Sequence, residues 1–230
     1  MTHSNPLNGK LLYAFGSSIV NGHLANTGFV EDIALDNHMS YRKFAVNGAT
    51  TRTSDPNNIL KQIKNAPSII PDFIIFDSWA NDAYAEIAND PNQFGEIATG
   101  FDSVLHSTTY CGGLETICKT LISKYPGTQF ILLATHKTPA RKLDVQEKMY
   151  QAALQICHKW AFNLIDLYNS GSFNTFIKEY QYNYSYDVVD SNGGNHAYGG
   201  SGTHPNADGY RTFYDPIITN KLLSLCSQSN

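Results

Sequence analysis

The sequence has little of what would assign a class of protein at once. Its four cysteines form no Cys-x-x-Cys pair, which argues against a zinc cluster or a disulfide framework. No apolar run approaches the length of a membrane span. The 16 lysines and arginines are scattered, so no basic stripe indicates a nucleic-acid partner. We therefore expect a protein that binds neither a membrane nor a nucleic acid, with Cys118 and Cys157 as reduced residues on the apolar faces of helices.

The first ten residues also lack the charged and then apolar layout of a secretory signal. We expect a cytoplasmic protein, with a mature form or a fragment of a secreted or phage protein as the alternative. At 230 residues, 42% of them hydrophobic, the chain is long enough for one well-buried core. No linker, internal repeat or low-complexity tract divides it, so a single domain over residues 1–230 is expected. The sequence does not indicate an oligomeric state.

Short apolar segments alternate along the chain with segments whose apolar residues recur at helical spacing. The segment at 72–77 is apolar in its centre, as is typical of a parallel strand covered on both faces. This alternation predicts an α/β fold in which a central parallel sheet lies between two layers of helices. The predicted strands are 11–15, 43–46, 72–77, 129–134 and 162–165, and the predicted helices are 29–39, 55–63, 114–122, 145–160 and 217–225.

Residues with useful chemistry follow the carboxyl ends of these strands, the edge at which ligands bind in open parallel sheets. Ser18 follows the first strand, Gly48 the second and Asn81 the third, while His136 follows the fourth. His204 comes late, before a proline-led turn and the terminal helix, a context that would hold an imidazole at the same edge. We therefore expect these residues to converge at one edge of the sheet.

Acyl transfer by serine needs a nucleophile, a base and donors aimed at the developing oxyanion. Ser18 and His204 are the candidate nucleophile and base, and the backbone N–H of Gly48 and the side-chain amide of Asn81 are the candidate donors. Each segment also has an ordinary explanation, since Gly-Ser-Ser can cap a helix, Asn-Gly is a common turn and a lone histidine is most often structural. His196, in a glycine-rich loop, is the rival base; the other histidines are expected to be structural.

Four segments of the chain resemble, in order, the four sequence blocks of the SGNH hydrolases, also called the GDSL esterase/lipase family. They span nearly the whole chain, and residues 201–210 resemble the last block most specifically. Residues 109–114 and 124–126 also resemble a subgroup associated with Gram-positive bacteria and their phages. The positions that match the family's Ser, Gly, Asn and His are Ser18, Gly48, Asn81 and His204.

The resemblance implies a flavodoxin-like three-layer α/β/α sandwich that hydrolyses ester bonds, often those of small acyl groups on carbohydrates, without a metal or an organic cofactor. Its substrate would be a small-molecule or glycan ester. Three positions depart from the family's pattern: Ser17 and Ser201 stand where the family has aspartate, and Trp79 stands where it has glycine.

The change at Ser201 concerns the mechanism, because an acid there orients the histidine and stabilises the imidazolium. A serine hydroxyl can accept a hydrogen bond from the imidazole N–H, but it carries no full charge. Asp187 and Asp190, in the preceding loop, are alternative acids. The sequence therefore predicts a Ser-His dyad whose activity is reduced.

Two functional hypotheses follow from these residues. The first is a serine esterase in which Trp79 narrows the pocket and so favours small acyl groups such as acetyl. The second is a catalytically silent carbohydrate-binding domain that uses Trp79 and the tyrosines of 180–186, although those tyrosines are more simply explained as an aromatic-rich loop packed on the core. A nucleotide binder is disfavoured, because residues 16–22 match no phosphate-binding glycine pattern. The candidate substrate contacts are Ser17, Trp79, Asp82 and Ser201.

Overall fold

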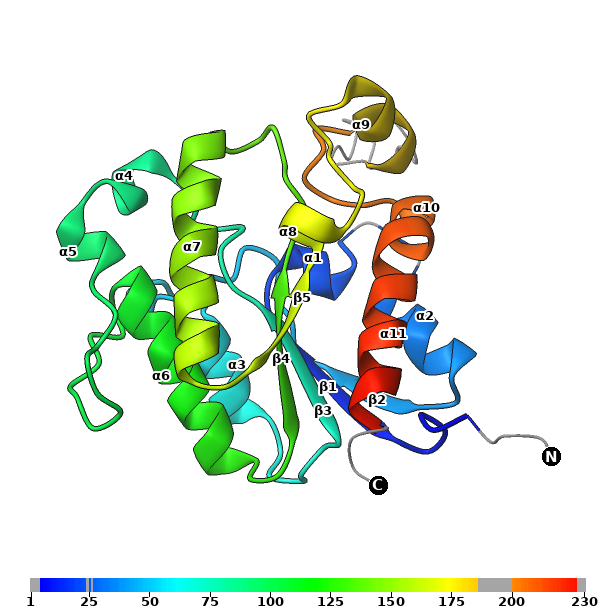
Figure 1. Ribbon diagram of the computed structural model, residues 1–230, viewed down its shortest axis with the longest axis horizontal. Coiled ribbons are helices and arrows are strands. Elements are labelled where there is room, and N and C mark those ends of the chain that lie inside the picture. Colours follow the sequence, from blue (N-terminus) through cyan, green and yellow to red (C-terminus); the bar gives the residue numbers. More distant parts are fainter. Residues whose placement is uncertain (1–4, 24, 26, 186–199, 227–230) are drawn as a thin grey trace.

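The centre of the fold is a five-stranded parallel sheet in the order β2-β1-β3-β4-β5 (Figure 1). The computed structural model describes residues 5–23, 25, 27–185 and 200–226. Helices cover both faces of the sheet, so the predicted three-layer α/β/α sandwich is confirmed. The strands are β1 (Leu11–Phe15), β2 (Ser40–Lys43), β3 (Phe73–Asp77), β4 (Gln129–Ala134) and β5 (Asn163–Asp166).

Alternate residues of the central strands supply two separate apolar cores, because successive side chains of a strand point to opposite faces. In β1, Tyr13 and Phe15 pack on one face, and Leu12 and Ala14 pack on the other. Burial on both faces explains why β1, β3 and β4 are apolar almost throughout. The first face is covered by α3 (Ile59–Asn65), α6 (Tyr110–Lys124) and α7 (Leu143–Lys159), and the second by α1 (Ser18–Asn21), α2 (Phe29–Asp36) and α11 (Asp215–Cys226).

The remaining helices are short. A π-helical turn, Tyr210–Tyr214, runs directly into α11, and α1, α8, α9 and α10 gather at the carboxyl edge of the sheet, at the top of Figure 1. They are α4 (Ala85–Ala88), α5 (Pro91–Phe94), α8 (Leu167–Ser170), α9 (Lys178–Tyr184) and α10 (Ala207–Gly209).

The second strand differs from the prediction. The sequence pattern placed it at 43–46, whereas β2 covers Ser40–Lys43. This strand lies at the edge of the sheet and is largely exposed, so it carries no apolar signal. The backbone N–H groups of Phe44 and Val46 nevertheless donate to carbonyls in the β1 segment at 2.8 and 3.0 Å, so the chain continues beside β1 as far as the Asn47-Gly48 turn.

Two further elements differ from the sequence pattern. The helix expected to begin near residue 55 begins at Ile59, capped by the Asn58 side chain. The tyrosine-rich segment, expected to be a loop, forms α9 as far as Tyr184. Tyr180 and Tyr184 lie one helical turn apart and pack against Phe213, with ring centroids 5.6 and 5.0 Å away. This aromatic packing stabilises a helix that its polar sequence does not indicate.

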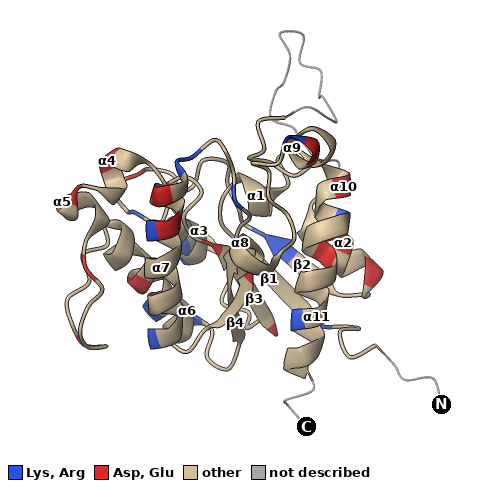
Figure 2. Ribbon diagram, turned by 45° about the horizontal axis from the view of Figure 1, so that its top comes forward, with Lys and Arg blue, Asp and Glu red and all other residues tan. Residues whose placement is uncertain are grey.

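Charged residues of both signs are interspersed on the helices of both layers (Figure 2). Within the part of the chain that the structure describes, no helix combines the length and the apolar character that a membrane span requires. Cys118 and Cys157 are buried in the core, as the sequence predicted.

Candidate active site

Ser18 is the first residue of α1 and follows β1 through a tight turn. Gly16 has φ +140°, and a Cβ at this position would lie 2.3 Å from Asp77 Oδ1, so the turn requires glycine. The Ser17 N–H donates to Asp77 Oδ1 at 2.9 Å, and the Ser17 hydroxyl donates to the other carboxylate oxygen. Burial raises the pKa of Asp77 to about 6, and the hydrogen bonds from Ser17 oppose that rise. Ser17 therefore anchors the turn that presents Ser18.

A buried glutamine holds the same turn from the other side. The Gly16 N–H donates to Gln62 Oε1 at 2.8 Å, and Gln62 Nε2 donates to the Gly16 carbonyl at 2.9 Å. Both backbone groups of Gly16 are thus satisfied by one side chain from α3, in the interior of the protein. The sequence analysis did not identify Gln62 or Asp77, since each lies 46 or more residues from the turn.

His204 meets Ser18 at the carboxyl edge of the sheet. The Ser18 hydroxyl lies 2.8 Å from His204 Nε2, although the two residues are 186 positions apart. With the hydroxyl as the donor, Nε2 of the neutral ring accepts and the ring proton is on Nδ1. This is the contact that a serine nucleophile and its general base must make.

The loop that carries His204 is held by buried polar groups. His136 Nε2 donates to the Gly202 carbonyl at 2.9 Å, and the Thr175 hydroxyl donates to the same oxygen at 2.8 Å. The Tyr214 hydroxyl lies 2.6 Å from His136 Nδ1 and is its donor when Nε2 carries the ring proton. His136 was expected to be structural, and the structure shows what it supports: the backbone two residues before His204.

The second and third loops of the site are tied to each other. Asn81 Nδ2 donates to the Ala49 carbonyl at 3.0 Å. Beside it, the buried Asp82 carboxylate accepts from the Thr51 N–H at 2.8 Å and from Arg52 Nε at 2.9 Å. Burial raises the pKa of Asp82 to about 6, against the lowering effect of these donors. The loop that contains Gly48 is therefore held against the loop that contains Asn81.

These loops and the His204 loop enclose a cavity of about 320 Å³. The structure thus brings together all four residues that the sequence predicted to form the catalytic centre. It also places His23 and Arg141 there, which the sequence analysis did not single out, because neither has a spacing or a motif that marks it. Among the described residues, the lining consists of Ser18, His23, Asn47, Gly48, Asn81, Arg141, Thr203 and His204.

His23 lies directly beside the candidate base. Its ring centroid is 4.8 Å from that of His204, at an interplanar angle of 61°. The Asn47 amide lies 2.7 Å from His23 Nδ1, and the other end of the Asn47 side chain accepts from Asn21 at 2.8 Å. These contacts link the turn before Gly48 to the segment after α1.

Three of the four predicted substrate contacts do not line this cavity. Ser17, Trp79 and Asp82 are each at most 2% exposed. Trp79 points into the core, edge-to-face with Tyr150 and Tyr168 at 5.8 Å. The prediction that these side chains touch the substrate was wrong, because each is occupied by the protein's own packing or hydrogen bonding. Trp79 in particular does not narrow the pocket.

The fourth predicted contact, Ser201, is exposed and does not line the cavity either. Its hydroxyl lies 3.1 Å from that of Thr203. The alternative acids Asp187 and Asp190 and the rival base His196 lie outside the described residues.

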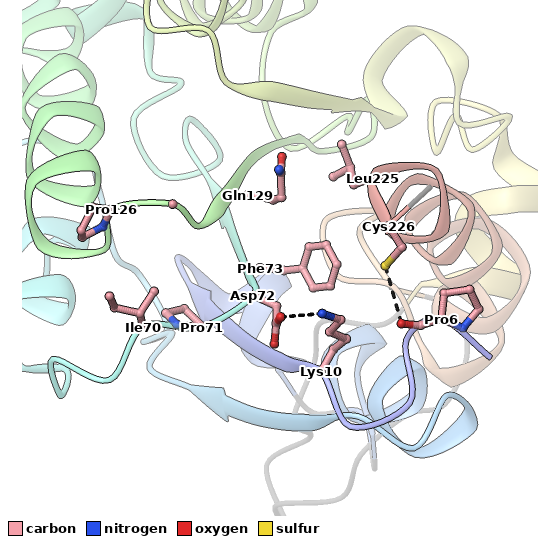
Figure 3. Close-up of a pocket in the computed structure, with 11 residues that line it drawn as sticks. Pro6, Lys10, Ile70, Pro71, Asp72, Phe73, Pro126, Gln129, Leu225 and Cys226 are labelled. Carbon is pink, nitrogen blue, oxygen red and sulfur yellow. Dashed lines mark hydrogen bonds and ion pairs between the residues drawn. The ribbon is translucent and has the colours of Figure 1, made fainter. Parts of the chain in front are cut away.

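A different cavity, of about 620 Å³, lies at the opposite edge of the sheet (Figure 3). It is bordered by the segments at the amino ends of β1, β3 and β4. Lys10 and Asp72, which line it, form an ion pair at 2.9 Å, and Asp72 also accepts from the Leu11 N–H at 2.8 Å. Since these charged groups satisfy each other and no serine or histidine lines the space, it offers no hydrolytic site.

Comparison with known proteins agrees with this geometry. The family model described as "GDSL-like Lipase/Acylhydrolase family" matches residues 14–212, a range that begins in β1 and extends past His204. The chain belongs to the GDSL-like lipase/acylhydrolase family. Membership in this family of SGNH hydrolases assigns ester hydrolysis of the lipase/acylhydrolase type to the chain. No curated protein matches the sequence.

Solved structures of other GDSL-type proteins share the fold at low sequence identity. A Lactobacillus plantarum protein is 17% identical, with 96% of this chain and 97% of that one covered and a TM-score of 0.71. A phospholipase A1 from Streptomyces albidoflavus is 16% identical over 93% and 99% of the two chains, with a TM-score of 0.62. A lipase/acylhydrolase from Enterococcus faecalis is 16% identical over 94% and 96%, with a TM-score of 0.57. At these identities the likeness establishes the fold and not the substrate.

Proposed function

We propose that this GDSL-family protein is a serine esterase that hydrolyses small acyl esters through Ser18 and His204. The observation that carries the proposal is the 2.8 Å contact between the Ser18 hydroxyl and His204 Nε2, in a cavity that Gly48 and Asn81 also line. Nucleophile, base and candidate oxyanion donors thus lie around one space.

In the first half of the reaction, His204 Nε2 takes the hydroxyl proton as Ser18 Oγ attacks the ester carbonyl. The carbonyl oxygen becomes an oxyanion, which accepts hydrogen bonds from the Asn81 amide and from the backbone N–H groups of Gly48 and Ser18. The N–H of Ser18 is suited to this role because the first residues of a helix have no intrahelical acceptor. The intermediate then expels the alcohol, which leaves with the proton from His204.

In the second half, water attacks the acyl-enzyme with His204 again as the base, and the acid is released. These steps need only the Ser18 and His204 side chains and the oxyanion donors. The group that receives the Nδ1 proton of His204 affects how well the imidazolium is stabilised. Ser201, where the family has aspartate, and Asp187 or Asp190 are the candidates for that position.

The cavity favours a short acyl group. Among the described residues its lining contains no leucine, isoleucine, valine, methionine or aromatic hydrocarbon ring, so a long acyl chain would gain little from burial there. We expect kcat/KM for 4-nitrophenyl acetate to exceed that for 4-nitrophenyl octanoate by about tenfold or more, since a hydrophobic groove would instead reward the longer chain by about 0.8 kcal/mol per methylene. Faster cleavage of the octanoate would exclude the acetyl-type preference.

Labelling with a small fluorophosphonate tests the proposal without knowledge of the natural ester. We expect intact-mass analysis to show one adduct on the wild-type protein and none on Ser18→Ala, because the probe reacts with an activated serine. Ser123→Ala is the matched control: Ser123 is an exposed serine on α6, and this variant should keep the adduct.

A folded wild-type protein that takes up no probe, or an adduct that persists in Ser18→Ala, would refute Ser18 as the nucleophile. Absence of any adduct would favour the silent carbohydrate-binding domain. The structure gives that alternative little surface to use, since Trp79 is buried and Tyr180 and Tyr184 pack on Phe213.

A further inference from the structure

Arg141 is the one arginine among the described residues that line the Ser18 cavity. It lies in the loop between β4 and α7, next to the edge of the sheet that carries the other site residues. Neither the proposed acyl transfer nor the family blocks assigns it a role. Its guanidinium stays charged at any physiological pH, so it places a permanent positive charge at the cavity.

The guanidinium is fixed in position by neutral groups. Nε donates to the Ala80 carbonyl at 3.2 Å, Nη1 donates to the Ala140 carbonyl at 3.0 Å, and Nη2 donates to the Tyr84 hydroxyl at 2.9 Å. Its Cζ atom also lies 4.2 Å from the centroid of the Tyr84 ring. These contacts use three of the five guanidinium N–H groups and leave one on each terminal nitrogen.

The other buried or half-buried arginine contacts in the fold have a different character. Arg52 pairs with Asp82 at 2.9 Å, and Arg211 pairs with Asp32 at 3.2 Å. In contrast, no carboxylate of the described residues lies within ion-pair distance of Arg141, and none of the described residues that line its cavity is acidic. The charge at the cavity is therefore not balanced by these residues, and a polar cavity of one sign attracts an ion of the other.

We propose that Arg141 is a specificity-determining residue that binds a carboxylate or phosphate group on the alcohol portion of the ester substrate. The inference rests on the proposed esterase function. The alcohol portion is assigned because an acetyl-sized acyl group has no ionisable substituent. One N–H on each terminal nitrogen matches the two oxygens of a carboxylate or phosphate, and the fixed guanidinium loses little freedom on binding.

The test compares matched aryl acetates that differ in charge. Wild type and Arg141→Gln are assayed on 4-nitrophenyl acetate, 3-carboxy-4-nitrophenyl acetate and a phosphonate-bearing aryl acetate. Arg141→Gln is expected to slow all three, because the guanidinium also holds the Ala80 carbonyl next to Asn81. The anionic esters should lose about 10- to 100-fold more kcat/KM than the neutral one, as expected for a lost charge-assisted contact.

Further variants separate charge from structure. Arg141→Glu should lower the anionic-to-neutral ratio below that of Arg141→Gln, and Arg141→Lys should restore part of it. Arg42→Gln removes the same charge from the exposed edge strand β2 and should leave the ratio as in wild type. Loss for both anionic esters supports a general oxyanion site, and loss for one alone identifies which group it takes.

A binding measurement keeps this test apart from the test of esterase function. In Ser18→Ala, the product 5-hydroxy-2-nitrobenzoate should bind more tightly than 4-nitrophenol, and adding Arg141→Gln should remove that difference. Turnover with an unchanged ratio in both Arg141→Gln and Arg141→Glu would overturn the anion site and leave the esterase intact. Anion-selective binding without fluorophosphonate labelling would do the reverse.

Discussion

Replacing His204 with glutamine should lower kcat by about 10³-fold or more, the upper part of the range for a lost general base. Glutamine can still accept a hydrogen bond from Ser18, but it cannot take the proton as Oγ attacks. The hydroxyl now 2.8 Å from Nε2 would then have to attack while protonated. Steady-state turnover of 4-nitrophenyl acetate by the purified, folded variant measures the effect.

His23→Gln is the matched control, since His23 lines the same cavity with its ring centroid 4.8 Å from that of His204. Its contact with the Asn47 amide places it beside the reaction rather than in it, so this variant should lose less than about tenfold in kcat, well below the range for a lost general base. If the two substitutions reduced kcat equally, His204 would not be the sole base.

Asn81→Ala should lower kcat by about 10²- to 10³-fold with a smaller change in KM, the pattern for loss of one oxyanion donor. The donor acts mainly on the charge that develops in the transition state, so removing it weakens binding of the ground state less. The same amide donates to the Ala49 carbonyl at 3.0 Å and so also holds the Gly48 loop in place. Separate kcat and KM values, with a thermal melt for each variant, measure the effect.

Two variants distinguish the donor role from support of the loop. Asn81→Asp keeps the size of the side chain but replaces the donor with an acceptor, so its kcat should be at least as low as that of Asn81→Ala. Asn21→Ala removes a hydrogen bond to Asn47 in the same loop and should change kcat by less than about tenfold, since it takes no donor from the oxyanion. A kcat for Asn81→Asp within threefold of wild type would contradict the assignment.

Sequence patterning was most successful where burial was symmetrical. β1 and β4 have the predicted limits, and β3 and β5 lie within one residue of them, because a strand covered on both faces must be apolar along its length. It failed at β2, where an exposed edge removes that requirement, and at α9, whose helix depends on aromatic contacts with Phe213. Local pattern contains no information about a partner that is distant in the chain.

The same distinction holds within the site. Ser18, Gly48 and Asn81 could be placed together from the sequence, because each follows the carboxyl end of a parallel strand and those ends share an edge. Trp79 was misplaced because its position in a motif does not say which way the side chain points. It turned into the core against Tyr150 and Tyr168.

By itself, therefore, the sequence determined the parallel sheet, the edge at which the site forms and the four residues that meet there, since all of these follow from periodicity and from the ends of strands. Only the tertiary structure decided which groups support them and what else the cavity presents. Gln62 and Asp77 hold the Ser18 turn across 46 and 60 residues, and Arg141 reaches the cavity through bonds to Ala80 and Tyr84. Such contacts depend on how separate loops pack in three dimensions, and no local spacing in the chain encodes that packing.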